Sequence, residues 1–197
     1  MRIATAKNHR LTFVAAGVLA AAALAGCSTT TGSSSKASAP SNRAELESQS
    51  TAALNRLYTA MPGTRELVSR AKGVLVCPAV LGGSFVVGVE HGRCVLRSGG
   101  TSRGYYSTTS GSVGWQMGGQ SKSVIYVFST AEAYDKFVNS KGWSVGGDAT
   151  VAVGRASANG SVDTSTIQAP VSSFVLTNAG LEAGVSVNGT KISKIDM

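Results

Sequence analysis

The stretch that decides the fold runs from residue 73 to residue 153. It begins Gly73-Val74-Leu75-Val76-Cys77-Pro78 and ends Ala149-Thr150-Val151-Ala152-Val153. Short runs of β-branched residues alternate in it with glycine pairs, a pattern typical of an antiparallel sheet with tight turns rather than a helical bundle. Many glycines also indicate close approaches between backbones. We therefore expect an α+β fold: a mostly antiparallel, strongly curved, glycine-rich β-sheet or partial barrel with about three covering helices.

The residues of this stretch predict a central strand at 74–77 and a hairpin after it. Strands at 85–90 and 93–96 flank His91-Gly92, and a two-residue loop with glycine second suits a type I′ turn. His91 is then a solvated turn residue, and 98–104 is a mobile loop. Asn188-Gly189 is the strongest hairpin pattern in the chain. The remaining strands are expected at 113–117, 124–128, 149–153, 171–176, 181–187 and 191–195.

Three helices are expected to cover the sheet. The first spans 42–61, with Asn42 as its cap, Glu45 at the capping-box spacing and Pro62-Gly63 at its end. It either lies on lipid or covers one face of the sheet, and its modest apolar face favours the second interpretation. The second helix spans 65–71, and the third opens at the capping box 129–132.

The first 41 residues are expected to be a processing signal and a tether. Arg2, Lys7 and Arg10 precede an uncharged apolar run at 11–24, which is short for a membrane span. The run ends in Leu24-Ala25-Gly26-Cys27, which resembles a bacterial lipobox. That resemblance implies a lipoprotein signal peptide at 1–26 and a lipidated Cys27, and Ser28 after it favours the outer membrane. The alternative is an ordinary signal peptide with a chance cysteine.

Residues 27–41 are rich in Ser and Thr and should form a flexible lipidated tether. A single domain is then expected at 42–197. The domain would face the periplasm or the cell surface.

The charge of the chain points to acidic partners. The formal net charge is +8, of which Arg2, Lys7 and Arg10 contribute three, so the remaining chain carries +5. No acidic residue lies between Glu90 and Glu132. The cations in that interval are Arg93, Arg97, Arg103 and Lys122. A basic face suits anionic phospholipid or phosphorylated glycans, although four charges over this interval also fit an ordinary soluble surface.

Two cysteines remain beyond Cys27. Cys77 and Cys94 lie in β-type runs that could be neighbours, and export would place them in an oxidising compartment. They form either a disulfide or two buried thiols. With His91 they do not make a closed set of four zinc ligands, so no metal and no cofactor is expected. Asp148 follows a glycine pair, where an aspartate more often fixes a turn than acts as a catalytic or ion-binding carboxylate.

Several blocks, in order, resemble the SYLF domain family of lipid-binding and actin-regulator modules. They include 71–74 leading to Pro78, 88–92, 111–121, 146–149 and 180–186, so the resemblance covers about 50–195. The resemblance implies phospholipid binding, of anionic or phosphoinositide type, rather than catalysis. Actin would not be met in the periplasm.

We expect a non-enzymatic, membrane-anchored domain whose headgroup contacts are Arg93, Arg97, Arg103 and Lys122. The alternative is a structural or interaction protein of the envelope, with envelope proteins or glycans as partners, that touches lipid only through its acyl chains. The sequence contains no P-loop, no G-x-S-x-G and no metal motif. No nucleic-acid partner is expected.

Overall fold

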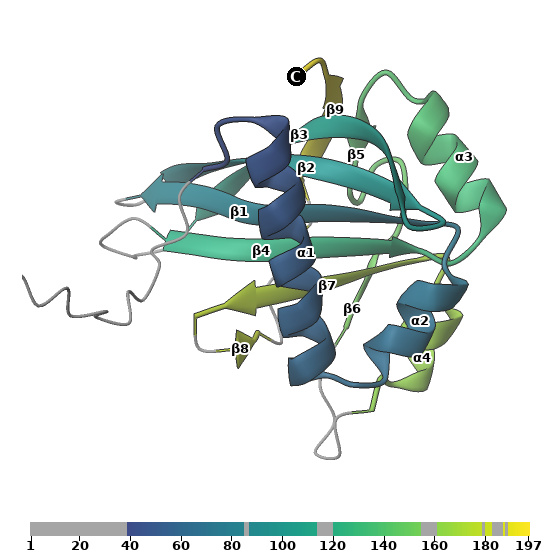
Figure 1. Cartoon of the computed structure of the whole chain (residues 1–197). Helices are drawn as coiled ribbons and strands as arrows, with labels where there is room; N and C mark the ends of the chain where they lie inside the picture. The colour runs from purple at the N-terminus through teal and green to yellow at the C-terminus, as the bar shows by residue number, and fades with distance from the viewer. Residues whose placement is uncertain are drawn as a thin grey trace, which may run out of the picture. The chain divides into compact units, whose positions relative to one another are not determined.

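The computed structural model describes residues 39–84, 87–113, 120–154, 161–178, 180–182, 187 and 189–197 (Figure 1). These belong to a compact unit that spans Ser35–Met197. The expected leader and most of the tether lie outside the described residues, as do 114–117 of the strand expected at 113–117, 183–186 of the strand expected at 181–187, the segment 155–160 and Asn188.

The described residues form four helices and a nine-stranded sheet (Figure 1). The helices are α1 (Arg43–Ala60), α2 (Thr64–Arg70), α3 (Ala131–Asn139) and α4 (Thr164–Gln168). The strands are β1 (Gly73–Ser84), β2 (Val87–Ser98), β3 (Thr101–Val113), β4 (Gln120–Phe128), β5 (Trp143–Ser144), β6 (Ala152–Val153), β7 (Val171–Thr177), β8 (Gly180–Leu181) and β9 (Lys191–Ile195). The expected α+β class is confirmed.

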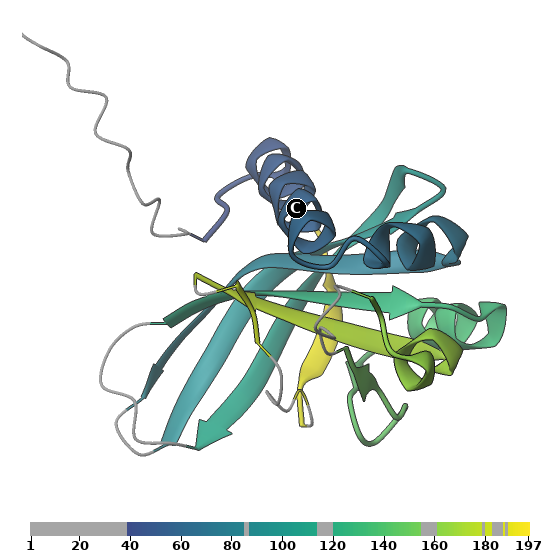
Figure 2. The ribbon, with the colours of Figure 1, turned by 90° about the horizontal axis from the view of Figure 1, so that it is seen from below.

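The sheet order is β5-β9-β3-β2-β1-β4-β7-β6, with β8 paired to β7. The pairs are antiparallel except β6–β7, which is parallel. Figure 2 shows how strongly the sheet curls, with α1 and α2 on one of its faces. In Figure 1, α1 crosses the strands on that face. The first helix therefore covers the sheet, as its modest apolar face suggested.

Two hydrophobic cores, one on each face of the sheet, hold the domain together. Side chains alternate along β1, so Leu75 and Cys77 enter one core while Val74 and Val76 enter the other. The first core lies under α3 and gathers the rings of Phe128, Phe137 and Trp143, with centroids 4.8–5.9 Å apart. The second core lies under α1 and includes Leu46, Leu57, Met61, Ile125 and Phe174. Each fully buried side chain of this size stabilises the fold by about 1.5–3 kcal/mol.

The helix ends follow from capping side chains. The Asn42 side chain accepts a hydrogen bond from the Glu45 backbone N–H at 2.9 Å, as expected for the start of α1. In a capping box the Glu45 carboxylate would accept a hydrogen bond from the N–H of Asn42. It accepts instead from the N–H of Ser41, one residue earlier, at 2.6 Å. Thr130 caps α3 by accepting from the Ala133 N–H. The sequence analysis missed α4, although Asp163 caps it through the Thr166 N–H at 2.9 Å.

The hairpin expected around His91-Gly92 is wrong. Strand β2 runs through both residues, and Gly92 pairs with Val80 of β1 and Thr108 of β3. A Cβ on Gly92 would lie 2.8 Å from the Ala79 carbonyl oxygen. The lack of a side chain at Gly92 therefore allows β1 and β2 to approach closely.

The turn lies instead within the expected mobile loop. Gly99 and Gly100 join β2 to β3 with φ angles of 59° and 77°. A type I′ turn needs two such positive values, and glycine adopts them without strain. Residues 101–104, which were also expected in the loop, are part of β3.

The hairpin expected around Asn188-Gly189 is also wrong. The following strand, β9, pairs with β3 and β5, and the preceding strand β8 pairs with β7. Gly189 still makes a turn, with φ of 77° and its N–H donated to the Val145 carbonyl at 3.0 Å. This turn leads into β9.

Close packing at Gly154 gives a test of the second core. A Cβ at this position would overlap the fully buried Phe174 ring. We expect Gly154→Ala to lower the free energy of unfolding by about 2 kcal/mol, the usual cost of overpacking a core, measured by urea denaturation of residues 35–197.

The control for this test is Gly111→Ala on β3, because an added Cβ there meets nothing within 4 Å. Its unfolding free energy should change by less than about 0.5 kcal/mol. Equal effects from both substitutions would contradict the packing argument.

Candidate functional site

The four cations expected to bind headgroups do not gather at one place. Lys122 of β4 forms an ion pair with Glu90 of β2, with Nζ 2.8 Å from Oε2 and both side chains 17% exposed. Ser110 of β3 donates a hydrogen bond to the same carboxylate oxygen at 3.0 Å. The Glu90 side chain lies over Gly82, because a Cβ on Gly82 would lie only 2.7 Å from the Glu90 Cγ atom. Lys122 therefore has a carboxylate partner in the sheet.

Arg97 of β2 is bound to α1. Its guanidinium lies 2.7 Å from the Glu47 carboxylate and 2.8 Å from the Glu47 carbonyl oxygen. Ser102 and Tyr105 also donate to this carboxylate. Burial alone raises the pKa of Glu47, but the hydrogen bonds from Ser102 and Arg97 and the Arg97 charge outweigh it, and the pKa lies below its usual value. Arg97 therefore fixes α1 to the sheet.

Arg93 holds the start of the domain. Its guanidinium donates to the Pro40 carbonyl oxygen at 2.9 Å and to that of Ser41 at 3.4 Å. Pro40 and Ser41 directly precede α1. Arg93 therefore fixes the point at which the described chain meets the sheet, beside β2.

Arg103 is the one cation of the four that is exposed and takes part in no ion pair among the described residues. It lies at an irregularity of β3, because Gly104 pairs with Leu96 while Ser102 pairs with Arg97. The extra residue between these pairs is Arg103.

Three further exposed cations, on β9 or next to β5, were not predicted from the sequence. Lys191 and Lys194 lie on β9, and Lys141 immediately precedes Gly142 and β5. None of the three forms an ion pair within the described part of the chain. Their spacing in the sequence gave no indication of proximity, since only the pairing of β9 with β3 and β5 brings them together.

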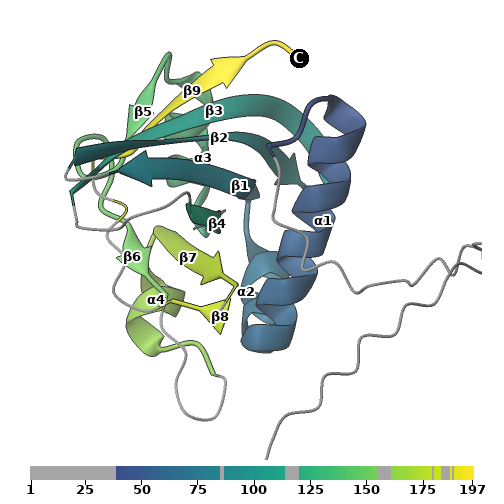
Figure 3. The same ribbon diagram turned by 90° about the vertical axis from the view of Figure 1, so that its left-hand side faces the viewer.

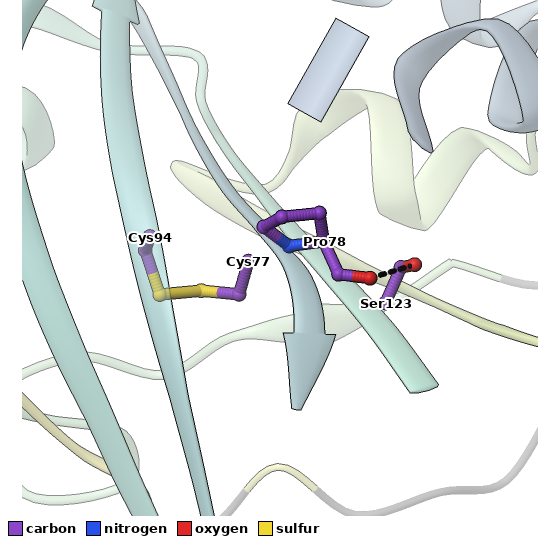
Figure 4. Close-up of a disulfide and its surroundings, with 4 residues drawn as sticks. All are labelled: Cys77, Pro78, Cys94 and Ser123. Carbon is purple, nitrogen blue, oxygen red and sulfur yellow. Dashed lines mark hydrogen bonds between the residues drawn. A yellow bond between two sulfur atoms is a disulfide. The ribbon is translucent and has the colours of Figure 1, made fainter. Parts of the chain in front are cut away.

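Cys77 and Cys94 are joined by a disulfide between neighbouring strands β1 and β2, shown in Figure 4. Their Cα atoms are 4.1 Å apart, and both residues are fully buried in the first core. Pro78 beside Cys77 interrupts the pairing of β1 with both neighbours. Its carbonyl oxygen accepts a hydrogen bond from the Ser123 hydroxyl at 2.6 Å (Figure 4).

Asp148 fixes a turn after β5. Its carboxylate accepts from the hydroxyl and the backbone N–H of Ser144, each at 2.7 Å. These hydrogen bonds lower the pKa of Asp148 below its usual range. His91 lies on the exposed surface of β2, and its Nδ1 is 3.1 Å from the Thr109 hydroxyl. Asp148, in its turn, and His91, on β2, each therefore have a local partner.

The described residues contain no group of three or more His, Cys, Asp and Glu side chains that could hold a metal ion. No helix within the described ranges is both long and apolar enough to cross a membrane.

Residues 109–196 match a family model. The family is Ysc84, described as Las17-binding protein actin regulator. Ysc84 is the SYLF domain, so the expected resemblance is confirmed over this segment, which runs from within β3 to the end of β9. The Ysc84 match covers somewhat less than half of the chain, and for 50–108 the resemblance stays a prediction. A search of curated proteins found no match.

The ion pair of Lys122 gives a test of its structural role. We expect Lys122→Gln to lower the free energy of unfolding by about 2 kcal/mol, because the half-buried Glu90 carboxylate loses its counter-charge. Chemical denaturation measures the change.

The control is Arg103→Gln, since this exposed cation has no ionic partner, and its effect should stay below about 0.5 kcal/mol. Glu90→Gln combined with Lys122→Gln should recover part of the lost stability. A Lys122→Gln protein as stable as the parent would show that the pair contributes nothing.

Proposed function

We propose that the chain is a non-enzymatic, lipid-anchored domain that binds the anionic headgroups of phospholipids in the bacterial envelope. The observation that carries this proposal is the uneven distribution of charge over the sheet. The sequence between Ser144 and Thr190 contains three acidic residues, Asp148, Asp163 and Glu182, and one basic residue, Arg155. Most cations of the described residues lie on α1, α2, α3 and the strands β2, β3, β4 and β9, or directly beside these elements. Such a distribution orients a domain toward an anionic surface.

The Ysc84 match supports a binding role. The family is described as a regulator that binds another protein, and that description includes no reaction. Las17 and actin belong to that description. We do not propose them as partners here, because the leader expected at 1–26 would carry the domain out of the cytoplasm.

The anchor that we propose is the acylated Cys27, in the outer membrane. Several acyl chains hold a protein stably, since each buried methylene contributes about 0.8 kcal/mol. The folded domain would then reach the membrane through residues 28–41. Its own surface would add contacts with headgroups.

The anchor is tested by Cys27→Ala in bacteria expressing the full chain. We expect the parent protein to sediment with membranes and to incorporate labelled fatty acid. The variant should incorporate no label and lose most of its membrane fraction, because one uncleaved apolar run at 11–24 is a poor span. Labelling of the variant at the level of the parent would rule Cys27 out as the lipidation site.

Headgroup binding is tested on residues 35–197, which hold both hydrophobic cores and lack the acyl chains. The measurement is co-sedimentation with vesicles of phosphatidylcholine alone or with phosphatidylglycerol. We expect binding only to the anionic vesicles, and we expect it to fall steeply between low and high salt, because exposed charges are screened.

Absence of binding to both vesicles at low salt would overturn the proposal. It would favour the alternative of an envelope protein that touches lipid only through its acyl chains. Binding that persists at high salt would indicate apolar insertion in place of headgroup attraction.

A further inference from the structure

Four exposed cations lie on or beside β3, β9 and β5 at one end of the sheet, and the two on β9, Lys191 and Lys194, begin on opposite faces because they are three residues apart. The Cε atom of Lys194 lies 3.8 Å from the position that a Cβ on Gly104 would take, and Gly104 directly follows Arg103. The Cε atom of Lys191 lies 3.5 Å from the corresponding position on Gly142, which directly follows Lys141. In each case a lysine of β9 lies over a glycine, and the residue before that glycine in the chain is another cation. We call the four residues, Arg103, Lys141, Lys191 and Lys194, the basic edge.

Strand pairing fixes where these side chains begin. Lys194 is opposite Tyr106 of β3, and Lys191 is opposite Thr109 of β3 on one side and Ser144 of β5 on the other. Neighbouring strands lie about 5 Å apart. The basic edge therefore follows the β3–β9–β5 end of the sheet (Figure 3).

Little negative charge compensates the basic edge. Asp196 follows β9, and Asp148 lies at the turn after β5, where Lys136 donates a 2.5 Å hydrogen bond to its carbonyl oxygen. All four cations are exposed and outside any ion pair of the described residues. Exposed positive charge with so little compensation attracts an anionic surface.

The proposed tether starts near the same edge. Arg43 at the start of α1 stacks over Tyr105 of β3, with its guanidinium carbon 5.3 Å from the ring centroid. Tyr105 pairs with Ile195 of β9. In Figures 1 and 3 the start of α1 and the C-terminal end of β9 lie at the same end of the sheet. A chain held to a bilayer through residues before 39 would present this end to it.

We infer that the basic edge is the surface that docks on anionic phospholipid, with the β3–β9–β5 end of the sheet turned toward the bilayer. The inference rests on the proposed function. Of the four headgroup contacts predicted from the sequence, it retains only Arg103. Arg93, Arg97 and Lys122 serve the fold through their partners.

The test compares two triple variants of residues 35–197 that lose the same net charge. The edge variant is Arg103→Gln, Lys191→Gln, Lys194→Gln. The control variant is Arg56→Gln, Arg65→Gln, Arg70→Gln, in three exposed arginines of α1 and α2. Each Lys or Arg near an anionic surface strengthens binding roughly fivefold, so the edge variant should bind phosphatidylglycerol vesicles about 100-fold more weakly. The control variant should stay within about threefold of the parent, because its arginines would lie far from the bilayer.

A charge-preserving variant separates lost charge from lost structure. Lys191→Arg combined with Lys194→Arg should bind like the parent, and circular dichroism should show the same fold for every variant.

The outcomes separate the inference from the function beneath it. If the parent does not bind anionic vesicles, the proposed function fails and the inference fails with it. If the parent binds and the two triple variants lose affinity equally, headgroup binding stands but the basic edge is wrong. Loss in the edge variant alone supports the edge as the docking surface.

Discussion

Burial of β1 on both faces is the constraint on which the rest of the structure depends. Its residues from Gly73 to Val80 are buried, and they alternate between the two cores. A strand with apolar side chains on both faces must be covered twice. α1 and α2 cover one face, while α3 and the curl of the sheet around Trp143 cover the other. The disulfide to Cys94 and the glycine approach at Gly92 then fix β2 against this strand.

Position in the sheet distinguishes cations that look alike in the sequence. Lys122 and Lys194 are both basic residues on strands, but Lys122 begins on a central strand within reach of Glu90. Lys194 begins on β9, near the end of the sheet, and is exposed. A half-buried lysine without a partner would be costly, so the interior one is paired. Lys194 is exposed and needs no partner within the protein, so its charge is available to an external anion.

The fold class could be predicted because it depends on local alternation and on glycine content. The cap at Asn42 could be found for the same reason, since a cap joins a side chain to a backbone N–H three residues later. The capping box at 129–132 located the start of α3 to within one residue, because the cap is Thr130 and not Ser129. Glycine was less informative in detail. His91-Gly92 and Gly99-Gly100 look equally like turns, but the first glycine is needed for contact with Ala79 and the second pair for positive φ.

The candidate site was harder to predict than the fold. Arg97 meets Glu47 and Arg93 meets Pro40 across large separations in the sequence. The interval without acids between Glu90 and Glu132 therefore gave a false impression of free positive charge. Lys191 and Lys194 were overlooked because nothing local connects them with Arg103. Their proximity depends on β9 pairing with β3 instead of with its own neighbour in the chain.

That pairing also governs when the domain can finish folding. β9 is the last strand of the chain, and it is inserted between β3 and β5, which are made much earlier. The middle of β3 lacks one of its two neighbours until the final residues arrive. Contacts between distant parts of a chain form slowly. A polypeptide that emerges with its N-terminus first would thus stay incompletely folded until β9 had also emerged, so the domain cannot close around β3 strand by strand in chain order.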